Sequence, residues 1–146
     1  MIIISHRGYE NGEDTLLENN PAQVKKLLDL GIDVEIDVSY NGRFFLGHDG
    51  SRYEVDLDFL KQSGLWCHAK DSMAFELMLQ NNVHCFWHQQ DDYTLTSRGI
   101  IWAYPSKEIH NLHQSVLLFP ENISSGLTNT QQERLYAICT DFPFKY

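Results

Sequence analysis

Short apolar runs that end in polar residues recur along the chain. The clearest is residues 32–38, where β-branched and acidic residues alternate in the order Ile32-Asp33-Val34-Glu35-Ile36-Asp37-Val38. Because successive side chains of a strand point to opposite faces, this alternation predicts a strand with one apolar and one acidic face. Two interpretations of the acidic face stay open. It lies in water at a sheet edge, or it is buried and a divalent cation lies near Glu35 and Asp37.

The other apolar runs predict further strands, at residues 2–5, 43–46, 65–70, 83–87, 100–104, 115–119 and 136–140. Asn41-Gly42 is a tight-turn signal, so we expect residues 34–48 to form a hairpin. Helices are expected where a capping residue or an apolar stripe marks them, at residues 21–30, 71–79 and 130–135, with a helical turn within 55–62. Residues 88–99 are expected to form a polar connection.

Strand and helix alternate along much of the chain, and the strands are nearly continuously apolar. This combination is typical of an α/β fold with a parallel sheet covered by helices. We count seven candidate parallel strands, and several of the segments that join them are too short for a full helix. The sequence contains no repeat, low-complexity tract or linker. It therefore predicts a single domain over residues 1–146.

Composition narrows the class of protein. Hydrophobic and charged contents of 42% and 21% are ordinary for a soluble globular chain, and the net charge of −9 argues against a nucleic-acid partner. Cys67, Cys85 and Cys139 lie inside apolar runs without a CxxC spacing, which favours free thiols in a reducing compartment. Because neither a signal peptide nor a membrane span is recognised, we expect a cytoplasmic protein without stable membrane insertion.

Candidate chemistry lies where the predicted strands end. His6 and Arg7 follow the first strand, and His68 and Lys70 end a later one. Further polar or aromatic residues at strand ends are Glu35, Asp37, His48, His88, Tyr104, Glu121 and Asp141. Because the carboxyl ends of parallel strands meet at one edge of a sheet, we expect these side chains to build one site.

Several of these residues form motifs that resemble the glycerophosphodiester phosphodiesterase family. In order, the motifs are His6-Arg7-Gly8, Glu18-Asn19, Glu35-Ile36-Asp37-Val38, His48-Asp49 and Thr140-Asp141-Phe142-Pro143. The resemblance is dense only up to Asp49. It implies a TIM-barrel fold of the phosphatidylinositol-phosphodiesterase type, a role in lipid metabolism, and metal-dependent hydrolysis of glycerophosphodiesters to glycerol phosphate and an alcohol. Because such a barrel typically needs about 250 residues, we expect a reduced barrel of about seven to eight mostly parallel strands, with some helices shortened to loops.

The resemblance also implies roles for individual residues. His6 and His48 match the two catalytic histidines, which act as general acid and base; imidazole suits this because its unperturbed pKa is near neutrality. Arg7 matches the arginine that binds the substrate phosphate. Glu35 and Asp37 match two metal ligands.

The predicted strand at residues 65–70 departs from the family pattern. Where the family has Glu-x-Lys, this chain has His68-Ala69-Lys70. Lys70 fits a phosphate contact. His68 would be a nitrogen ligand in place of an oxygen one, which weakens Mg²⁺ or Ca²⁺ and favours Mn²⁺ or Zn²⁺. In a second interpretation His68 binds water or the phosphate, and only the two carboxylates hold the metal.

The hypothesis that follows is a metal-dependent hydrolase of a small phosphodiester substrate. The alternative is a catalytically impaired module that binds a phosphate ligand on the same fold, motivated by the short barrel and by His68. A third hypothesis, proton abstraction from sugar phosphates, rests only on fold analogy. We assign no site role to Trp66, Trp102, His84, His110 and His113, which are expected to be core, structural or surface residues.

Overall fold

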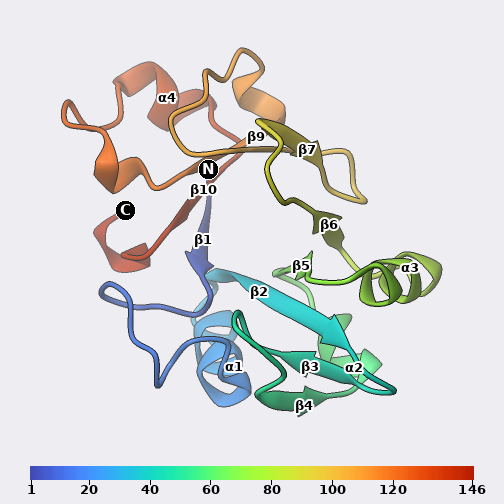
Figure 1. Cartoon of the computed structure of the whole chain (residues 1–146). Coiled ribbons are helices and arrows are strands. Elements are labelled where there is room, and N and C mark those ends of the chain that lie inside the picture. Colours follow the sequence, from blue (N-terminus) through green and yellow to red (C-terminus); the bar gives the residue numbers. More distant parts are fainter.

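The computed structural model covers residues 1–146 and is an α/β fold built on one mixed sheet (Figure 1). The strands are β1 (Ile2–His6), β2 (Asp33–Tyr40), β3 (Phe44–Leu46), β4 (Tyr53–Val55), β5 (Leu65–Ala69), β6 (Cys85–Trp87), β7 (Tyr93–Leu95), β8 (Ile101–Ala103), β9 (Ser115–Leu118) and β10 (Ala137–Thr140). The helices are α1 (Pro21–Asp29), α2 (Leu57–Leu60), α3 (Ser72–Gln80) and α4 (Asn129–Arg134), with 3₁₀ turns η1 (Leu112–Gln114), η2 (Pro120–Asn122) and η3 (Pro143–Lys145).

Seven strands pair in parallel, in the spatial order β6-β5-β2-β1-β10-β9-β8. The prediction of a mostly parallel sheet is therefore confirmed. Since all seven strands point the same way, their carboxyl ends lie along one edge of the sheet. This common edge is where the polar residues of the sequence are brought together.

Strand β2 pairs with three other strands of the sheet. Val34 pairs with Ser5 of β1 and with Leu65 of β5, so β2 has a parallel neighbour on both edges. The last residues of β2 pair with β3 in the expected hairpin, and β4 adds a further antiparallel strand. Tyr53–Val55 therefore corrects the prediction that a helical turn begins at Val55. The helix α2 begins only at Leu57, because the Asp56 side chain caps it.

The last strand of the sheet, β7, was not predicted. It lies within the expected polar connection 88–99 and pairs antiparallel with β8. Tyr93 and Leu95 are exposed, so β7 lacks the buried alternating face by which a strand is recognised. Three hydrogen bonds join this segment to β6: Thr94 Oγ1 donates to Trp87 O (2.9 Å), Ser97 N donates to Cys85 O (2.7 Å), and Cys85 N donates to Ser97 Oγ (3.0 Å). The edge strands β6 and β7 are thus linked, although no strand ladder closes the sheet.

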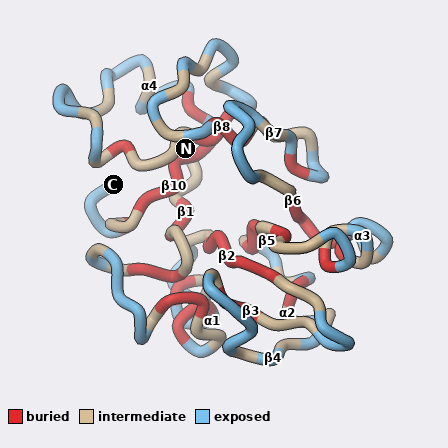
Figure 2. Tube along the Cα trace, in the orientation of Figure 1, coloured by how far each residue is buried: buried red, intermediate tan, exposed pale blue.

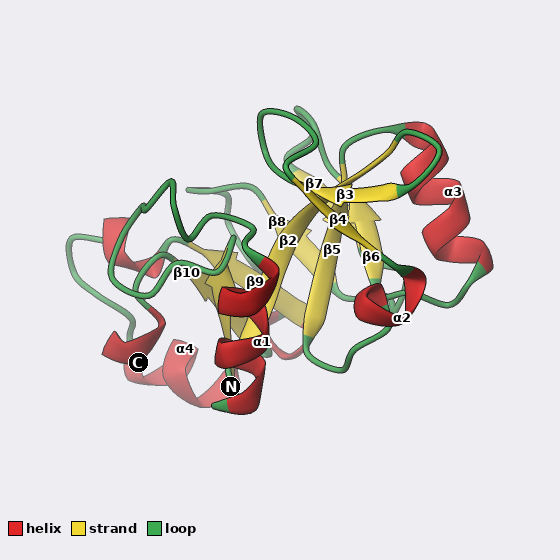
Figure 3. Cartoon of the chain, turned by 90° about the horizontal axis from the view of Figure 1, so that it is seen from below, coloured by secondary structure: helices red, strands yellow, loops and turns green.

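The two faces of the sheet carry separate apolar clusters. Val34, Ile36 and Val38 point outward and pack with residues of α1, α2 and α3, as expected from the alternation in β2. The opposite face holds a second cluster that includes Trp66, Phe86 and Trp102 among its members, next to the acidic face of β2. Figure 3 shows α1, α2 and α3 around β2, β5 and β6. Figure 2 shows buried residues along β1, β2 and β10, whereas the chain around α4 is largely exposed.

Local sequence explains the two main helices. Asn20 accepts hydrogen bonds from the amides of Ala22 and Gln23 and so caps α1. Asp71 caps α3 through the amide of Ala74. The three cysteines are buried and free, as predicted. None of the helices is both long and apolar enough to cross a membrane.

Candidate active site

The carboxyl ends of the parallel strands surround a cavity of about 490 Å³. Six of the seven predicted site residues line it: His6, Arg7, Glu35, His48, His68 and Lys70. The seventh, Asp37, lies beneath them and contacts four of them. The neutral part of the wall is formed by Ala69, Trp102, Tyr104, Pro105, Leu118 and Phe119, together with His88 and Gln89.

The acidic face of β2 is buried. Glu35 is 3% exposed and Asp37 is 1% exposed. Because β2 lies between β1 and β5, the interpretation of an edge strand with its acidic face in water is wrong. Two carboxylates are buried in this way only when cations or hydrogen-bond donors surround them.

Asp37 is surrounded by positive groups. Its Oδ2 lies 3.2 Å from Arg7 Nε and 3.3 Å from His48 Nδ1, and its Oδ1 lies 3.3 Å from His68 Nδ1 and 3.5 Å from Lys70 Nζ. Burial alone would raise the pKa of Asp37. The hydrogen bonds from the two histidines and the charges of Arg7 and Lys70 outweigh burial, and hold this pKa well below its usual range. Oδ1 is nevertheless buried without a hydrogen bond of good geometry.

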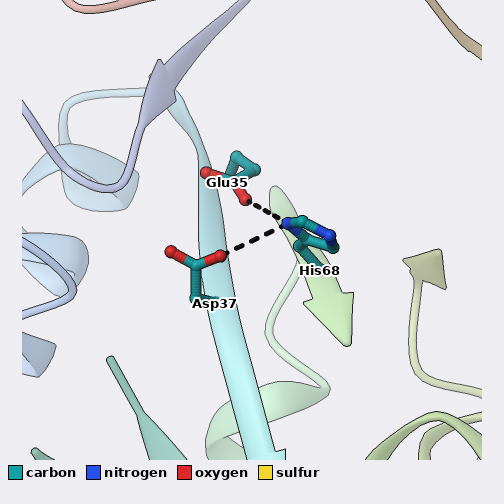
Figure 4. Close-up of side chains that lie close together, drawn as sticks. All are labelled: Glu35, Asp37 and His68. Atoms are coloured by element: carbon teal, nitrogen blue, oxygen red, sulfur yellow. Dashed lines mark ion pairs between the residues drawn. The ribbon is translucent and has the colours of Figure 1, made fainter. Parts of the chain in front are cut away.

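His68 is oriented by a backbone carbonyl. Its Nε2 lies 2.8 Å from His88 O, which can only accept, so Nε2 carries a proton. The other nitrogen, Nδ1, faces Glu35 Oε1 at 3.7 Å and Asp37 Oδ1 at 3.3 Å (Figure 4). Burial lowers the pKa of His68, but the hydrogen bonds and charges of the two carboxylates outweigh burial and raise this pKa to about 9. The position between these two oxygens therefore attracts a proton or another cation.

These three side chains fit a metal ion. One ligand atom from each of Glu35, Asp37 and His68 lies within 4.8 Å of the other two. A histidine that donates its distal N–H to a backbone carbonyl is the usual arrangement at metal sites, because the bond fixes the ring with its free nitrogen toward the ion. One imidazole and two carboxylates suit Mn²⁺ or Zn²⁺ better than Ca²⁺.

Arg7 connects the acidic cluster to His48. Its backbone N–H donates to Glu35 Oε2 (3.2 Å), and its Nη1 and Nη2 lie 3.0 Å from Glu18 Oε1 and 3.2 Å from His48 Nε2. Burial lowers the pKa of Arg7, but the charges of Asp37 and Glu35 outweigh it and raise this pKa. Since a guanidinium only donates, His48 Nε2 accepts, and its Nδ1–H faces Asp37.

Two residues of the loop before α1 position this cluster, and the sequence analysis gave them no role. The buried amide of Asn19 accepts from Asp37 N at 2.9 Å and donates to Asp37 Oδ2 at 3.1 Å. The Asn19 N–H also donates to Arg7 O at 2.8 Å. Glu18 binds the Arg7 guanidinium. The Glu18-Asn19 pair within the family resemblance was the one signal for this function.

His6 forms a separate pair with Asp141. The Nδ1 of His6 donates to Asp141 Oδ1 at 2.7 Å, so the neutral ring has its lone pair on Nε2. Glu121 in turn accepts hydrogen bonds from Thr140 Oγ1 (2.9 Å) and Asp141 N (3.0 Å). The sequence placed Asp141 and Glu121 at strand ends without a role. Both support His6, Asp141 directly and Glu121 through the turn that carries Asp141.

Two further histidines lie in or near the interior: His84 is buried and His88 is half-buried. His88 lies by the cavity against Tyr104, and neither of its ring nitrogens has a hydrogen-bond partner. Burial, together with the charge of His68, lowers its pKa. His84 packs on Trp66 away from the cavity, and burial lowers its pKa to about 4. His84 is therefore structural, whereas His110 and His113 are exposed, in keeping with the predictions for these three residues.

Comparison with known proteins adds nothing to this geometry. No protein-family model, curated protein or solved structure matches the chain.

Proposed function

We propose that this protein is a metal-dependent phosphodiester hydrolase that converts a diester into a phosphomonoester and an alcohol. The observation that carries the proposal is the meeting of three kinds of group at one cavity. Two histidines, His6 and His48, adjoin two cationic side chains, Arg7 and Lys70, above the cluster of Glu35, Asp37 and His68. This combination is what a phosphoryl-transfer site needs: proton transfer, positive charge and a metal ion.

The proposal extends to the fold. We regard the arc of seven parallel strands, together with the β7 segment that is hydrogen-bonded to β6, as a reduced (β/α) barrel. In this view β7 stands where an eighth parallel strand would be. Loops and 3₁₀ turns replace the helices around β8 and β9, which agrees with a chain far shorter than the usual barrel of about 250 residues.

Glu35, Asp37 and His68 would hold the divalent ion. When bound, the ion would polarise a phosphate oxygen and favour the ionised form of a nearby hydroxyl. Arg7 and Lys70 would bind the other phosphate oxygens and offset the negative charge that grows on them.

The two histidines have different surroundings, which favours a division of roles. His6 would be the general base, because Asp141 holds its Nδ1–H and leaves the Nε2 lone pair to take a proton. That proton comes from water, whose oxygen then bonds to phosphorus and gives the phosphomonoester directly, or from a neighbouring hydroxyl of the substrate, which gives a cyclic phosphodiester that water opens to the phosphomonoester in a second step. As the bond from phosphorus to the alcohol oxygen breaks, His48 that has taken up a solvent proton on Nε2 would donate this proton to the leaving oxygen. When Arg7 binds a phosphate oxygen of the substrate, its hydrogen bond to His48 Nε2 would break, and Nε2 would be free for this step.

Hydrolysis assays with matched variants test the proposal. The full chain, stripped of metal and reloaded with Mn²⁺, Zn²⁺, Mg²⁺ or Ca²⁺, should hydrolyse a glycerophosphodiester or an aryl phosphodiester. His6→Ala and Glu35→Ala should each abolish turnover. His110→Ala, whose side chain is 82% exposed, is the histidine control and should retain it. Activity that survives both site substitutions contradicts the proposal. Tight binding of phosphate without turnover of any diester would instead favour the binding-module hypothesis.

A further inference from the structure

A second cavity adjoins the candidate active site. It measures about 570 Å³, and it shares Pro105, Leu118 and Phe119 with the first cavity as lining residues. The two cavities therefore meet along the carboxyl end of β9. Neither the metal cluster nor the phosphate-binding cations extend into the second cavity.

Eight of the thirteen residues that line the second cavity are apolar. Beyond the shared residues its apolar lining consists of Ile109, Leu112, Leu117, Ile123 and Leu135. These side chains come from β9, from the turns on both sides of it and from the end of α4. Its one lysine, Lys107, is already paired with Asp92 at 2.8 Å. The rest of the polar lining is Ser106, Glu108, Asn122 and Gln131. The apolar side chains offer an occupant hydrophobic contact.

Phe119 stands where the two cavities meet. Its backbone is left-handed, with φ of 50°, a conformation that bulky residues rarely adopt. Its ring lies 5.0 Å from the His6 ring, edge to face. The amide of Phe119 donates to Cys139 O at 2.8 Å, so the strand geometry holds the residue in this position. Phe119 therefore contacts the candidate catalytic residue His6 and lines both cavities, so a ligand that extends from one cavity into the other would pass its ring.

We propose that the second cavity receives an aliphatic chain of the substrate, so that the preferred phosphodiester carries a single hydrocarbon chain. The phosphate lies at Arg7 and Lys70, and the chain passes Phe119 and contacts Leu117 and Ile123. This inference rests on the proposed function for its phosphate site. It adds a substrate class that neither the metal cluster nor the two histidines define.

Binding of n-alkyl phosphates to the full chain tests this placement independently of turnover. Calorimetric titration should give a Kd that falls about three- to fourfold for each added methylene, until the chain fills the cavity, with inorganic phosphate as the reference. Leu117→Thr and Ile123→Thr should each reduce the advantage of the longest chain about tenfold and leave the Kd of inorganic phosphate unchanged. Lys70→Met should weaken every member of the series, inorganic phosphate included.

The control is Leu95→Thr, which alters a third cavity; this cavity shares Glu108 and Ile109 with the second one, but Leu95 lines neither the second cavity nor the candidate active site. It should leave the whole series unchanged. A Kd that does not depend on chain length overturns the inference, and so does a chain-length effect that Leu95→Thr removes and Leu117→Thr does not. Loss of all diester hydrolysis in the wild type would count against the proposed function alone, because the alkyl phosphates report binding without chemistry.

Discussion

The two halves of the parallel sheet differ in what they support. In the N-terminal half, β1, β2 and β5 carry nearly all the ionised groups of the site, and α1, α2 and α3 cover their outer face. In the C-terminal half, β8 and β9 contribute an apolar wall, and short 3₁₀ turns stand in place of long helices. The comparison teaches that the buried charges lie in the half of the sheet that helices cover, whereas the half with few helices has an apolar cavity.

Physical reasons connect packing with charge in the first half. Asp37 and Glu35 are stable in the interior only because several donors hold fixed positions around them. A helix-covered strand provides such fixed positions. An aliphatic chain forms no hydrogen bonds that require fixed partners, so an apolar wall built from loops and turns is sufficient to bind it.

The largest expected effect comes from removing Asp37, the carboxylate at the centre of the charged cluster in the N-terminal half. Asp37→Ala leaves Arg7, His68 and Lys70 without their shared counter-charge. We expect the free energy of unfolding to fall by about 3–5 kcal/mol, as for other broken buried ion pairs, and hydrolysis to be lost. Chemical denaturation of the metal-free protein measures this change. The matched substitution in the other half is Asp92→Ala, which breaks an exposed pair with Lys107 and should leave stability unchanged. A small effect of Asp37→Ala would contradict the account.

The second prediction concerns proton transfer at His6. Asp141→Asn keeps a hydrogen-bonding side chain beside Nδ1 but no longer favours the Nδ1–H tautomer, so kcat should fall by about 10²–10⁴ with little change in KM. Glu121→Gln, which acts only through the turn of Asp141, should lower kcat less. Steady-state kinetics at several pH values separates these effects. An Asp141→Asn protein with wild-type kcat would rule out His6 as the general base.

The third prediction uses the pH dependence of stability in the metal-free protein. The pKa of His68 is raised to about 9, from 6.5 in the unfolded chain, so its protonation stabilises the fold fully below pH 6.5. That stabilisation should be lost as pH rises from 6.5 to 9, by about 3 kcal/mol. His68→Asn should remove the alkaline loss.

His84 provides the opposite control for that experiment. Its pKa is lowered to about 4, so its neutral form is favoured in the fold, and stability should fall as pH drops from 6.5 toward 4. His84→Asn should alter only this acidic limb. A His68→Asn protein that still loses stability above pH 6.5 would contradict the proposed charge state of His68.

The smallest expected effect tests the loop that orients the cluster. Asn19→Ala removes two hydrogen bonds to Asp37 while leaving every candidate catalytic group in place. We expect about 1–3 kcal/mol of destabilisation in thermal or chemical unfolding, together with weaker metal binding. Asn41→Ala, in the exposed hairpin turn, is the control of the same residue type. Equal effects of the two substitutions would mean that Asn19 does not support the site.

Local patterns predicted the parts of the fold that depend on local rules. The alternation in β2 correctly placed Val34, Ile36 and Val38 against the helices, and the Asn41-Gly42 turn correctly predicted the hairpin. Strand β7 was missed because its outward side chains remain exposed and its partners, which include β8 and Trp87, lie elsewhere in the chain. Strand β4 was missed for a related reason, since it is defined by pairing with β3.

The site was predictable as a set of residues but not as an arrangement. All seven predicted residues meet, because parallel strands bring their carboxyl ends together. The orientation of His68 was not predictable, since it depends on a backbone carbonyl contributed by residue 88. The clamp of Asn19 on Asp37 likewise depends on a left-handed residue in a loop, and no periodic pattern encodes it.

The central claim is that Glu35, Asp37 and His68 hold a divalent metal ion, and a binding titration tests it most directly. Mn²⁺ added to the metal-free protein, followed by electron paramagnetic resonance, should bind at one site. Glu35→Gln and His68→Ala should each weaken that binding more than about tenfold, and His110→Ala should not. Binding that both site substitutions leave intact, or no binding in the wild type, would contradict the account.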